Sequence, residues 1–218
     1  DWDWQFAREI TPILLQGLKV TLIATILGAA VAAVLGLVFA LLRRSSNRVV
    51  ARTAGFLVQF IRGTPLLVQL YFIFYVLPDI GIRLPALAAG VIGMGLHYAT
   101  YAAEVYRGGI EAVARGQWEA ARATNLTMRQ TWSHVILPQA LKPMMAPYVN
   151  QSVTQLKNTS LVSIIAVPDL VYNATLINAD TYRPLEVYTI VALIYFAILF
   201  PSTLVARRLE RGLTYDKV

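Results

Sequence analysis

The sequence predicts an all-α integral membrane protein with five transmembrane helices and a folded cytoplasmic hairpin. Of its 218 residues, 57% are hydrophobic and only 14% are charged, too few to cover a soluble globule. Several apolar stretches reach the ~18–20 residues that cross the hydrocarbon core of a bilayer. The basic residues stand in short segments beside these stretches, which places the net charge of +7 at membrane surfaces rather than on a nucleic acid.

Five apolar segments account for the expected spans, at about residues 13–42, 54–77, 84–105, 144–167 and 187–205. The first contains Gly28, Ala32 and Gly36, small residues that let another helix approach closely. A cluster of arginines ends this segment. Pro78 follows the second segment and Arg107 the third, polar side chains interrupt the fourth, and arginines end the fifth.

The basic residues give the expected orientation. Fourteen of them lie in the segments 43–62, 107–142 and 207–217, whereas four lie on the other side of the spans. Because basic residues gather in cytoplasmic loops, we expect an outside N-terminus and a cytoplasmic C-terminus, which five spans satisfy. The acidic, aromatic start lacks the basic region of a signal peptide, so the first span is expected to stay in a single membrane domain of residues 1–218.

Arg62-Gly63-Thr64-Pro65 has two interpretations. Gly and Pro break helical hydrogen bonds that lipid cannot replace, which favours a helix kink surrounded by protein. Alternatively, a helix simply starts here, with Pro65 in its first turn.

The segment 107–142 predicts a pair of short helices. Residues 112–123 are rich in Ala and Glu, which favours a helix. Asn125 is suited to end this helix in a left-handed conformation, and Thr127 to Gln130 form a capping-box sequence that opens the next one. Pro138 is expected to end the unit. Trp118, Leu126 and Trp132 are candidate anchors for a partner protein, although an amphipathic hairpin resting on lipid headgroups would have the same spacing.

Within this segment, Glu119-Ala120-Ala121, Asn125, Val135 and Leu137-Pro138 resemble the EAA loop of ABC importer permeases. The consensus has Gly where this chain has Asn125 and Ile where it has Val135. Both changes are mild, since Asn tolerates a positive φ and Val keeps a branched apolar side chain. The resemblance implies a type I importer-like fold and an ATPase-coupling surface. Its residues are Gly116, Trp118, Glu119, Ala120, Ala121, Asn125, Leu137 and Pro138.

Four further segments resemble the polar amino-acid branch of that family, the histidine/glutamine/arginine/opine type. They are Arg62-Gly63-Thr64-Pro65-Leu66-Leu67-Val68-Gln69, Ala103-Glu104-Val105-Tyr106-Arg107-Gly108-Gly109, Gly116-Gln117-Trp118-Glu119 and Lys157-Asn158-Thr159-Ser160-Leu161. The chain is also similar to members that take up ectoine-like compatible solutes. The resemblance implies a second permease subunit, of the same or a sister chain, two ABC ATPase subunits that bind ATP and Mg, and an extracytoplasmic solute-binding protein. It also implies the bacterial inner membrane.

A polar stripe interrupts the fourth apolar segment. Four of its side chains fall on one helical face at i, i+3, i+4 and i+7, and polar groups in lipid are costly unless they function or pair. Together with three residues of the third segment they form the candidate substrate path: Tyr98, Tyr101, Glu104, Gln151, Thr154, Gln155 and Asn158. The alternative is that the stripe only makes hydrogen bonds between helices.

Two of these residues bear on the solute. Family members for cationic substrates often carry Asp where this chain has Asn158, so the resemblance favours a zwitterion. Glu104 is suited to meet an ammonium group, or alternatively to pair with Arg107 at i+3. His97 and His134 fall on opposite predicted membrane sides, which excludes a shared metal. Each is expected to be a structural hydrogen-bonding residue.

The sequence contains no G-x-x-x-x-G-K-[ST] loop, so this chain is not expected to bind ATP in that manner. It also lacks the H-E-x-x-H and G-x-S-x-G motifs and any cysteine, and no catalytic residue, metal site or cofactor is predicted. The alternative function is an ion-gradient-driven secondary transporter or channel. Proteins of that class usually show buried acidic residues or inverted repeats, and neither is clear in this sequence.

Overall fold

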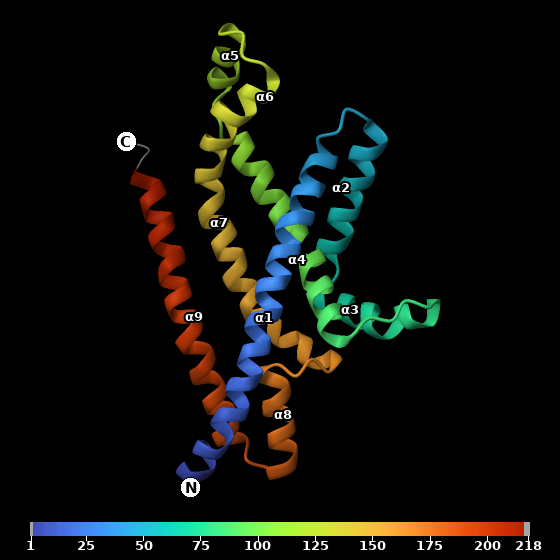
Figure 1. Ribbon diagram of the computed structural model, residues 1–218, viewed down its shortest axis with the longest axis vertical. Coiled ribbons are helices and arrows are strands. Elements are labelled where there is room, and N and C mark those ends of the chain that lie inside the picture. Colours follow the sequence, from blue (N-terminus) through green and yellow to red (C-terminus); the bar gives the residue numbers. More distant parts are fainter. Residues whose placement is uncertain (1, 216–218) are drawn as a thin grey trace.

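The computed structural model describes residues 2–215, and every regular element in this part of the chain is a helix. The long helices are α1 (Trp4–Arg43), α2 (Arg48–Gly63), α4 (Ala86–Glu111), α7 (Leu137–Asn158) and α9 (Pro184–Tyr215). The shorter elements are α3 (Leu66–Tyr71), η1 (Phe72–Val76), η2 (Leu77–Ile80), α5 (Arg115–Ala123), α6 (Met128–Gln130), η3 (Thr131–Ile136), η4 (Thr159–Ile165) and α8 (Leu170–Thr181). The N-terminal end of α1 and α8 lie at one end of the molecule, and α5 and α6 lie at the other (Figure 1).

Helix α1 is central and packs against α2, α4, α7, α8 and α9. Its buried face includes the small residues Gly17, Thr21, Ala24, Gly28, Ala32, Gly36 and Ala40. A Cβ atom on Gly36 would lie 2.6 Å from the Cβ of Ala102 in α4, closer than real atoms approach. The predicted close approach of another helix is therefore confirmed, because only small side chains leave room for the neighbouring backbone.

The second apolar segment is broken rather than straight. Helix α2 and the run Leu66–Ile80 that follows it meet at an angle of 103°. Pro65 stands at the N-cap of α3, so a new helix starts directly after it, close to the second interpretation, and the segment is broken instead of kinked within one helix. Lipid cannot bond the carbonyl groups that a break exposes. Here the Gln69 side chain bonds them, since its Nε2 donates to Ile61 O at 2.8 Å and to Thr64 O at 3.0 Å.

The prediction that Pro138 ends the hairpin unit is wrong. The helix continues without a break from η3 into α7, with Pro138 in the first turn of α7. Proline lacks an N–H group and clashes with the carbonyl group four residues before it in a regular α-helix. Because η3 is wound as a wider π-helical turn, the carbonyl groups before Pro138 are displaced from their α-helical positions. The clash is therefore avoided, and the helix continues past Pro138.

The fourth apolar segment also ends differently from a single straight span. Helix α7 narrows into the 3₁₀ turns of η4, and the run then bends by 49° into α8. We expected residues 168–186 to connect two spans, and much of this connection is helical. Leu170 and Ala174 of α8 are buried. Asp169 caps α8, with its Oδ1 accepting from Tyr172 N at 2.8 Å.

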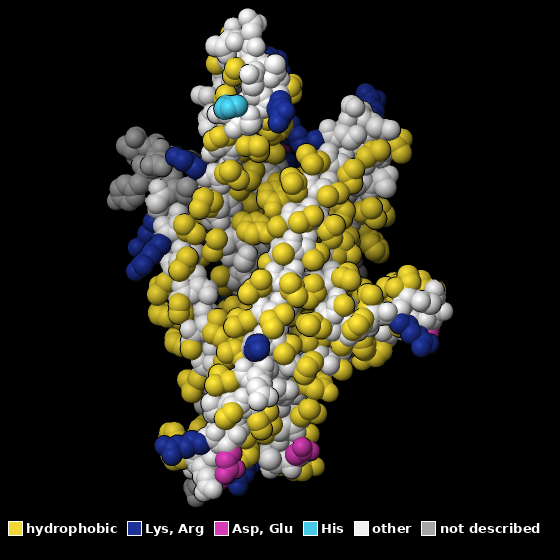
Figure 2. Space-filling view, viewed as in Figure 1, with side chains coloured by type: hydrophobic (Ala, Val, Ile, Leu, Met, Phe, Trp, Pro, Cys, Tyr) yellow, Lys and Arg dark blue, Asp and Glu magenta, His cyan; other side chains and the backbone are white. Residues whose placement is uncertain are grey.

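Two helical stretches are long and apolar enough to cross a membrane, Trp4–Arg43 and Pro184–Gly212. The two bent runs, Arg48–Ile80 and Met128–Thr181, meet the same measure if each is counted as one span. Helix α4 is long enough but more polar, so the count of five spans stays a prediction. Hydrophobic side chains cover the middle of the face shown in Figure 2, and almost all charged ones lie toward its ends and edges.

Candidate functional site

A cleft of about 410 Å³ lies between α4 and α7. Its walls are His97, Tyr98, Tyr101, Glu104 and Val105 from α4, and Pro147, Gln151, Thr154 and Asn158 from α7. The lining positions recur every three or four residues along each helix, which brings them to one face. Six of the seven predicted path residues therefore meet in one cleft.

Hydrogen bonds between the two helices hold the polar groups of the cleft. Asn158 Nδ2 donates to the Tyr98 hydroxyl at 2.7 Å, and Gln151 Nε2 donates to Tyr98 O at 3.0 Å. Gln151 Oε1 is buried and accepts no hydrogen bond from residues 2–215. Thr154 bonds only within its own helix, to Asn150 O at 3.0 Å. The wall of the cleft thus contains a buried amide oxygen without a partner among the described residues, close to the rings of Tyr98 and Tyr101.

Gln155 does not lie in the cleft. Its side chain is 1% exposed and turns toward α1, where Nε2 donates to Thr25 O at 3.4 Å. A Cβ atom on Gly28 would lie 2.6 Å from that same Nε2, so the small residue makes room for the amide. The interhelical alternative is therefore the one that the structure shows for Gln155. The spacing of the stripe placed Gln155 on the same helical face as Gln151 and Asn158. It did not reveal that the Gln155 side chain contacts α1 instead of the cleft.

Glu104 is surrounded by arginines from three helices. Its Oε1 lies 2.5 Å from Arg43 Nη1 of α1 and 3.6 Å from Arg62 Nη1 of α2, and its Oε2 lies 2.8 Å from Arg107 Nη2. The Arg62 guanidinium also stacks over the ring of Tyr101, at 4.8 Å from its centroid. The predicted pair with Arg107 is confirmed. A carboxylate already shared by three cations is poorly placed to meet a solute ammonium as well.

Three wall residues were not predicted, His97, Val105 and Pro147, and His97 is the one among them that carries a hydrogen-bonding side chain. It stands seven positions before Glu104 and four before Tyr101, so the helical spacing alone placed it on the same face. The prediction of a hydrogen-bonding residue is confirmed, because its Nδ1 lies 3.1 Å from Gln69 Nε2. Its ring also packs edge-on against Tyr98, at 5.2 Å between centroids.

The predicted hairpin forms at the end of the molecule farthest from α8 (Figure 1). Asn125 has φ 54°, and Leu126 N donates to Ala121 O at 3.1 Å, as in a Schellman ending. Thr127 and Gln130 form the predicted capping box. Both local predictions are therefore confirmed, and helix α5 starts at residue 115 rather than 112.

The eight predicted coupling residues fall into two groups, one that packs inside the hairpin and one with exposed side chains. Ala121 is only 3% exposed, and Trp118 packs edge-on against Trp132 at 5.2 Å between ring centroids. These side chains hold the hairpin together instead of facing outward. Exposed residues are Gly116, Glu119, Ala120, Asn125, Leu137 and Pro138. A partner would meet this second set.

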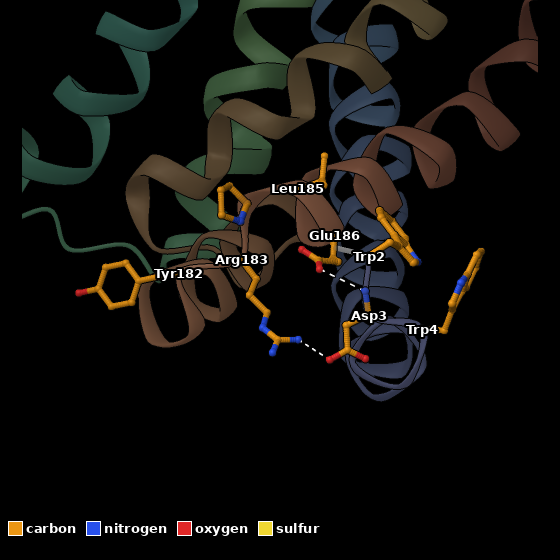
Figure 3. Close-up of a pocket in the computed structure, with 8 residues that line it drawn as sticks. Trp2, Asp3, Trp4, Tyr182, Arg183, Leu185 and Glu186 are labelled. Atoms are coloured by element: carbon orange, nitrogen blue, oxygen red, sulfur yellow. Dashed lines mark hydrogen bonds and ion pairs between the residues drawn. The ribbon is translucent and has the colours of Figure 1, made fainter.

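A second hollow, of about 620 Å³, lies where the N-terminal residues meet the link between α8 and α9 (Figure 3). Arg183 Nη1 lies 2.6 Å from Asp3 Oδ2, and Asp3 N donates to Glu186 at 3.4 Å. The Arg183 guanidinium holds the pKa of the Asp3 carboxyl below its usual value. The hollow is wide and its ion pair is exposed. None of the predicted site residues is among the described residues that line it. These contacts tie the start of α1 to the start of α9.

A helical membrane protein with a cleft of aromatic and polar residues between two helices and a folded hairpin at one end has the features of a transport permease. The chain belongs to the family of the binding-protein-dependent transport system inner membrane component, which matches residues 32–215. The resemblance read from the EAA segment is therefore confirmed, and the protein is a permease subunit of an ABC transporter.

Relatives match nearly the whole chain. It is 43% identical to a probable amino-acid ABC transporter permease protein of Sinorhizobium fredii, over 95% of this chain and 90% of the relative. It is 34% identical to the glutamine transport system permease protein GlnP of Escherichia coli, over 96% and 97%. The likeness therefore extends over most of each relative's length.

Solved structures give the same fold. An amino acid ABC transporter crystallised with histidines is 36% identical, with a TM-score of 0.90, over 97% of this chain and 99% of that one. A methionine ABC transporter in an inward-facing conformation is 20% identical, with a TM-score of 0.71 over 92% and 98%, and shows a likeness of fold alone. The fold is that of type I ABC importer permeases.

Proposed function

We propose that this ABC permease subunit carries a polar amino acid or a similar compatible solute, and that the cleft between α4 and α7 lies on the solute's path. The observation that supports this is the meeting of six predicted path residues in one cleft. The relatives named for amino acids and for glutamine support the solute class. The ectoine-like branch stays a prediction within this class.

The chemistry of the cleft favours a zwitterion over a doubly basic solute. Asn158 is neutral, and the carboxylate of Glu104 is already shared by Arg43, Arg62 and Arg107. The cleft therefore offers neutral hydrogen-bonding groups, chiefly Gln151 and Asn158, instead of a free negative charge. A second positive charge on the solute would have no partner there.

The exposed residues of the hairpin are the proposed docking surface for a separate ABC ATPase subunit. They surround Glu119 and Ala120, which carry the motif that resembles the EAA loop. The chain itself would have no catalytic role, because ATP and Mg would bind to the ATPase pair. A second permease and an extracytoplasmic solute-binding protein complete the proposed importer. Bacillus subtilis has two glutamine ABC transporter permease relatives, GlnP and GlnM, which supports a sister chain as the second permease.

We further propose five spans in the bacterial inner membrane, as parts of one permease domain. They are α1, the bent run α2–η2, α4, the bent run α7–α8, and α9. The N-terminus would be outside, and the hairpin and C-terminus cytoplasmic, because basic residues predominate near the hairpin end. Cysteines at Gln117 and Tyr182 test this, since the native chain has none and Tyr182 is 86% exposed. An impermeant maleimide added to intact cells should label position 182 and spare 117, and the reverse pattern would overturn the orientation.

The test of function is uptake by proteoliposomes that contain the permease, its partner subunits and a panel of radiolabelled amino acids and ectoine. Uptake should require ATP inside and should stop with vanadate. Uptake driven by an ion gradient without ATP would support the secondary-transporter alternative and overturn the proposal. Uptake of lysine or arginine in preference to zwitterions would overturn the solute class.

A further inference from the structure

His97 and Gln69 form a polar contact between the cleft wall and the break in the second apolar segment. His97 belongs to α4 and lines the cleft, although only 8% of it is exposed. Gln69 belongs to α3 and bonds two carbonyl groups of the break. The contact between Gln69 Nε2 and His97 Nδ1, at 3.1 Å, joins the two places.

The two carbonyl bonds settle which way the Gln69 amide points. Its nitrogen lies 2.8 Å from Ile61 O and 3.0 Å from Thr64 O. If the amide were turned over, its oxygen would face two other oxygens with no hydrogen between them, so the nitrogen must occupy this place. The two hydrogens of this nitrogen serve the two carbonyl groups, so what faces the ring of His97 is an amide nitrogen that cannot accept a hydrogen bond.

This amide orientation decides the proton of the imidazole. A hydrogen on Nδ1 would point at a nitrogen that cannot accept it, so we assign His97 Nδ1 as unprotonated. In a neutral imidazole the hydrogen then lies on Nε2. Among the side chains and carbonyl groups that the structure describes, none bonds His97 Nε2. The ring thus carries a donor without a partner in the wall of the cleft.

We propose that His97 is a solute-recognition residue whose Nε2–H donates to the carboxylate of a zwitterionic solute, and that Gln69 is the positioning residue that keeps the proton on Nε2. This rests on the proposed function of the cleft. The ammonium group and the carboxylate of a bound zwitterion then have separate partners. Gln151 Oε1, buried and without a partner among residues 2–215, accepts from the ammonium group, and His97 donates to the carboxylate.

The first experiment observes the proton directly. The chain has two histidines, so the ¹⁵N spectrum of the purified permease labelled at histidine is simple, and His134→Asn assigns it. We expect His97 to have a protonated Nε2 and a bare Nδ1, and Gln69→Leu to weaken that preference. A proton on Nδ1 in the unchanged protein would overturn the proposal.

The second experiment measures solute binding to the permease–ATPase complex without binding protein, which removes that protein's own selectivity. The probes are the amino acid from a panel of twenty that binds best, and the primary amine that lacks its α-carboxylate. Asparagine places an acceptor where Nδ1 was, so His97→Asn keeps the Gln69 contact but loses the donor to the cleft. Glutamine places an N–H group near the Nε2 position, so His97→Gln keeps that donor.

We expect His97→Asn to raise the Kd of the amino acid by about tenfold to a hundredfold, the usual value of a hydrogen bond to a charged group, and to leave that of the amine nearly unchanged. His97→Gln should retain most of the affinity, and the His134→Asn control all of it. An equal loss for amino acid and amine in His97→Asn would mean that the ring only packs, and would overturn the proposal. Absence of binding by every amino acid to the unchanged complex would instead overturn the proposed function, and this inference with it.

Discussion

The hairpin of α5, α6 and η3 and the cleft between α4 and α7 are held by contacts of very different reach. In the hairpin, the bonds that shape the turn join residues three to five positions apart, as between Thr127 and Gln130 or between Leu126 and Ala121. In the cleft, Asn158 bonds Tyr98 across 60 residues and Arg43 bonds Glu104 across 61.

This difference explains where a motif identifies function and where it does not. A turn made by near neighbours is specified by the residues that form it, so a short motif predicts its backbone. A cleft made by distant helices depends on how these helices rotate and pack. One face of α7 carries Gln151 and Asn158 into the cleft, whereas Gln155, four positions after Gln151, packs against α1.

The largest expected effect is at the exposed surface of the hairpin. Replacing Glu119 with Lys reverses a charge at the proposed docking surface, which commonly costs a few kcal/mol, so uptake should fall by about a hundredfold while the membrane fold persists. Copurification with the ATPase and uptake by proteoliposomes measure this. Ala123→Lys, an added charge at an exposed position of the same helix outside the motif residues, is the control. Normal uptake with normal expression in Glu119→Lys would overturn the docking surface.

Ala121→Trp should act differently from Glu119→Lys. Because Ala121 is buried inside the hairpin, a large ring there would disrupt the hairpin itself, at a cost of about 1–3 kcal/mol or more. The matched control is Ala120→Trp, which adds the same ring at an exposed position. Limited proteolysis of the purified permease should cut the hairpin faster in Ala121→Trp and not in Ala120→Trp. Equal cleavage of both would contradict the assignment of Ala121 to the interior.

In the cleft, Asn158→Asp should shift the solute preference toward cations. The carboxylate is able to accept from the Tyr98 hydroxyl, so the fold is kept, and a charged acceptor adds roughly 1–3 kcal/mol to a bond with a cationic donor. The ratio of uptake rates for arginine and a zwitterion should therefore rise by about tenfold, measured without the binding protein. An unchanged ratio would place the cleft off the solute path.

The pair Gln151→Ala and Gln155→Ala separates the two faces of α7. Gln151→Ala removes the unpartnered oxygen together with the bond to Tyr98 O, so it should weaken solute binding by about tenfold or less and also lower the unfolding temperature. Gln155→Ala removes a buried interhelical bond, so it should lower the unfolding temperature and leave the affinity for solute unchanged. Calorimetry and solute titration on the same samples compare them. Loss of affinity in Gln155→Ala alone would reverse the assignment of the faces.

The smallest expected effect lies at the far end, at Asp3 and Arg183. The folded pKa of Asp3 is lower than its unfolded value of 3.8, because Arg183 stabilises the carboxylate. The stabilisation is therefore fully present above pH 3.8 and is lost as the pH falls through the lower, folded value. Asp3→Asn should lower the unfolding temperature slightly at pH 6 and not at acid pH. A difference that persists below the folded pKa would show another cause.

Most of the helices were predictable, since long apolar runs and terminal arginines mark them in any context. Breaks were harder. Gly63 and Pro65 predicted a kink or a helix start, but neither the 103° angle nor the bonds from Gln69 to the carbonyl groups of Ile61 and Thr64. Pro138 predicted an end that did not occur, because a π-helical turn before it relieves the clash. Both outcomes depend on contacts and winding that residue preferences do not contain.

The candidate site divides in the same way. Polar side chains inside apolar segments, together with helical spacing, selected six residues of the cleft and also Gln155, which lies outside it. The helical spacing did not reveal that Glu104 forms ion pairs with three arginines from α1, α2 and α4. It also did not reveal that Gln69 contacts the ring of His97.

By itself, the sequence determined the membrane class, the small-residue face of α1 and the turn of the hairpin, because each follows from hydropathy, side-chain size or bonds between near neighbours. The tertiary structure alone decided which polar groups face the cleft and which form hydrogen bonds between helices. The physical reason is that a buried donor or acceptor takes whichever partner packing brings within about 3 Å, and residues far apart in the chain supply that partner.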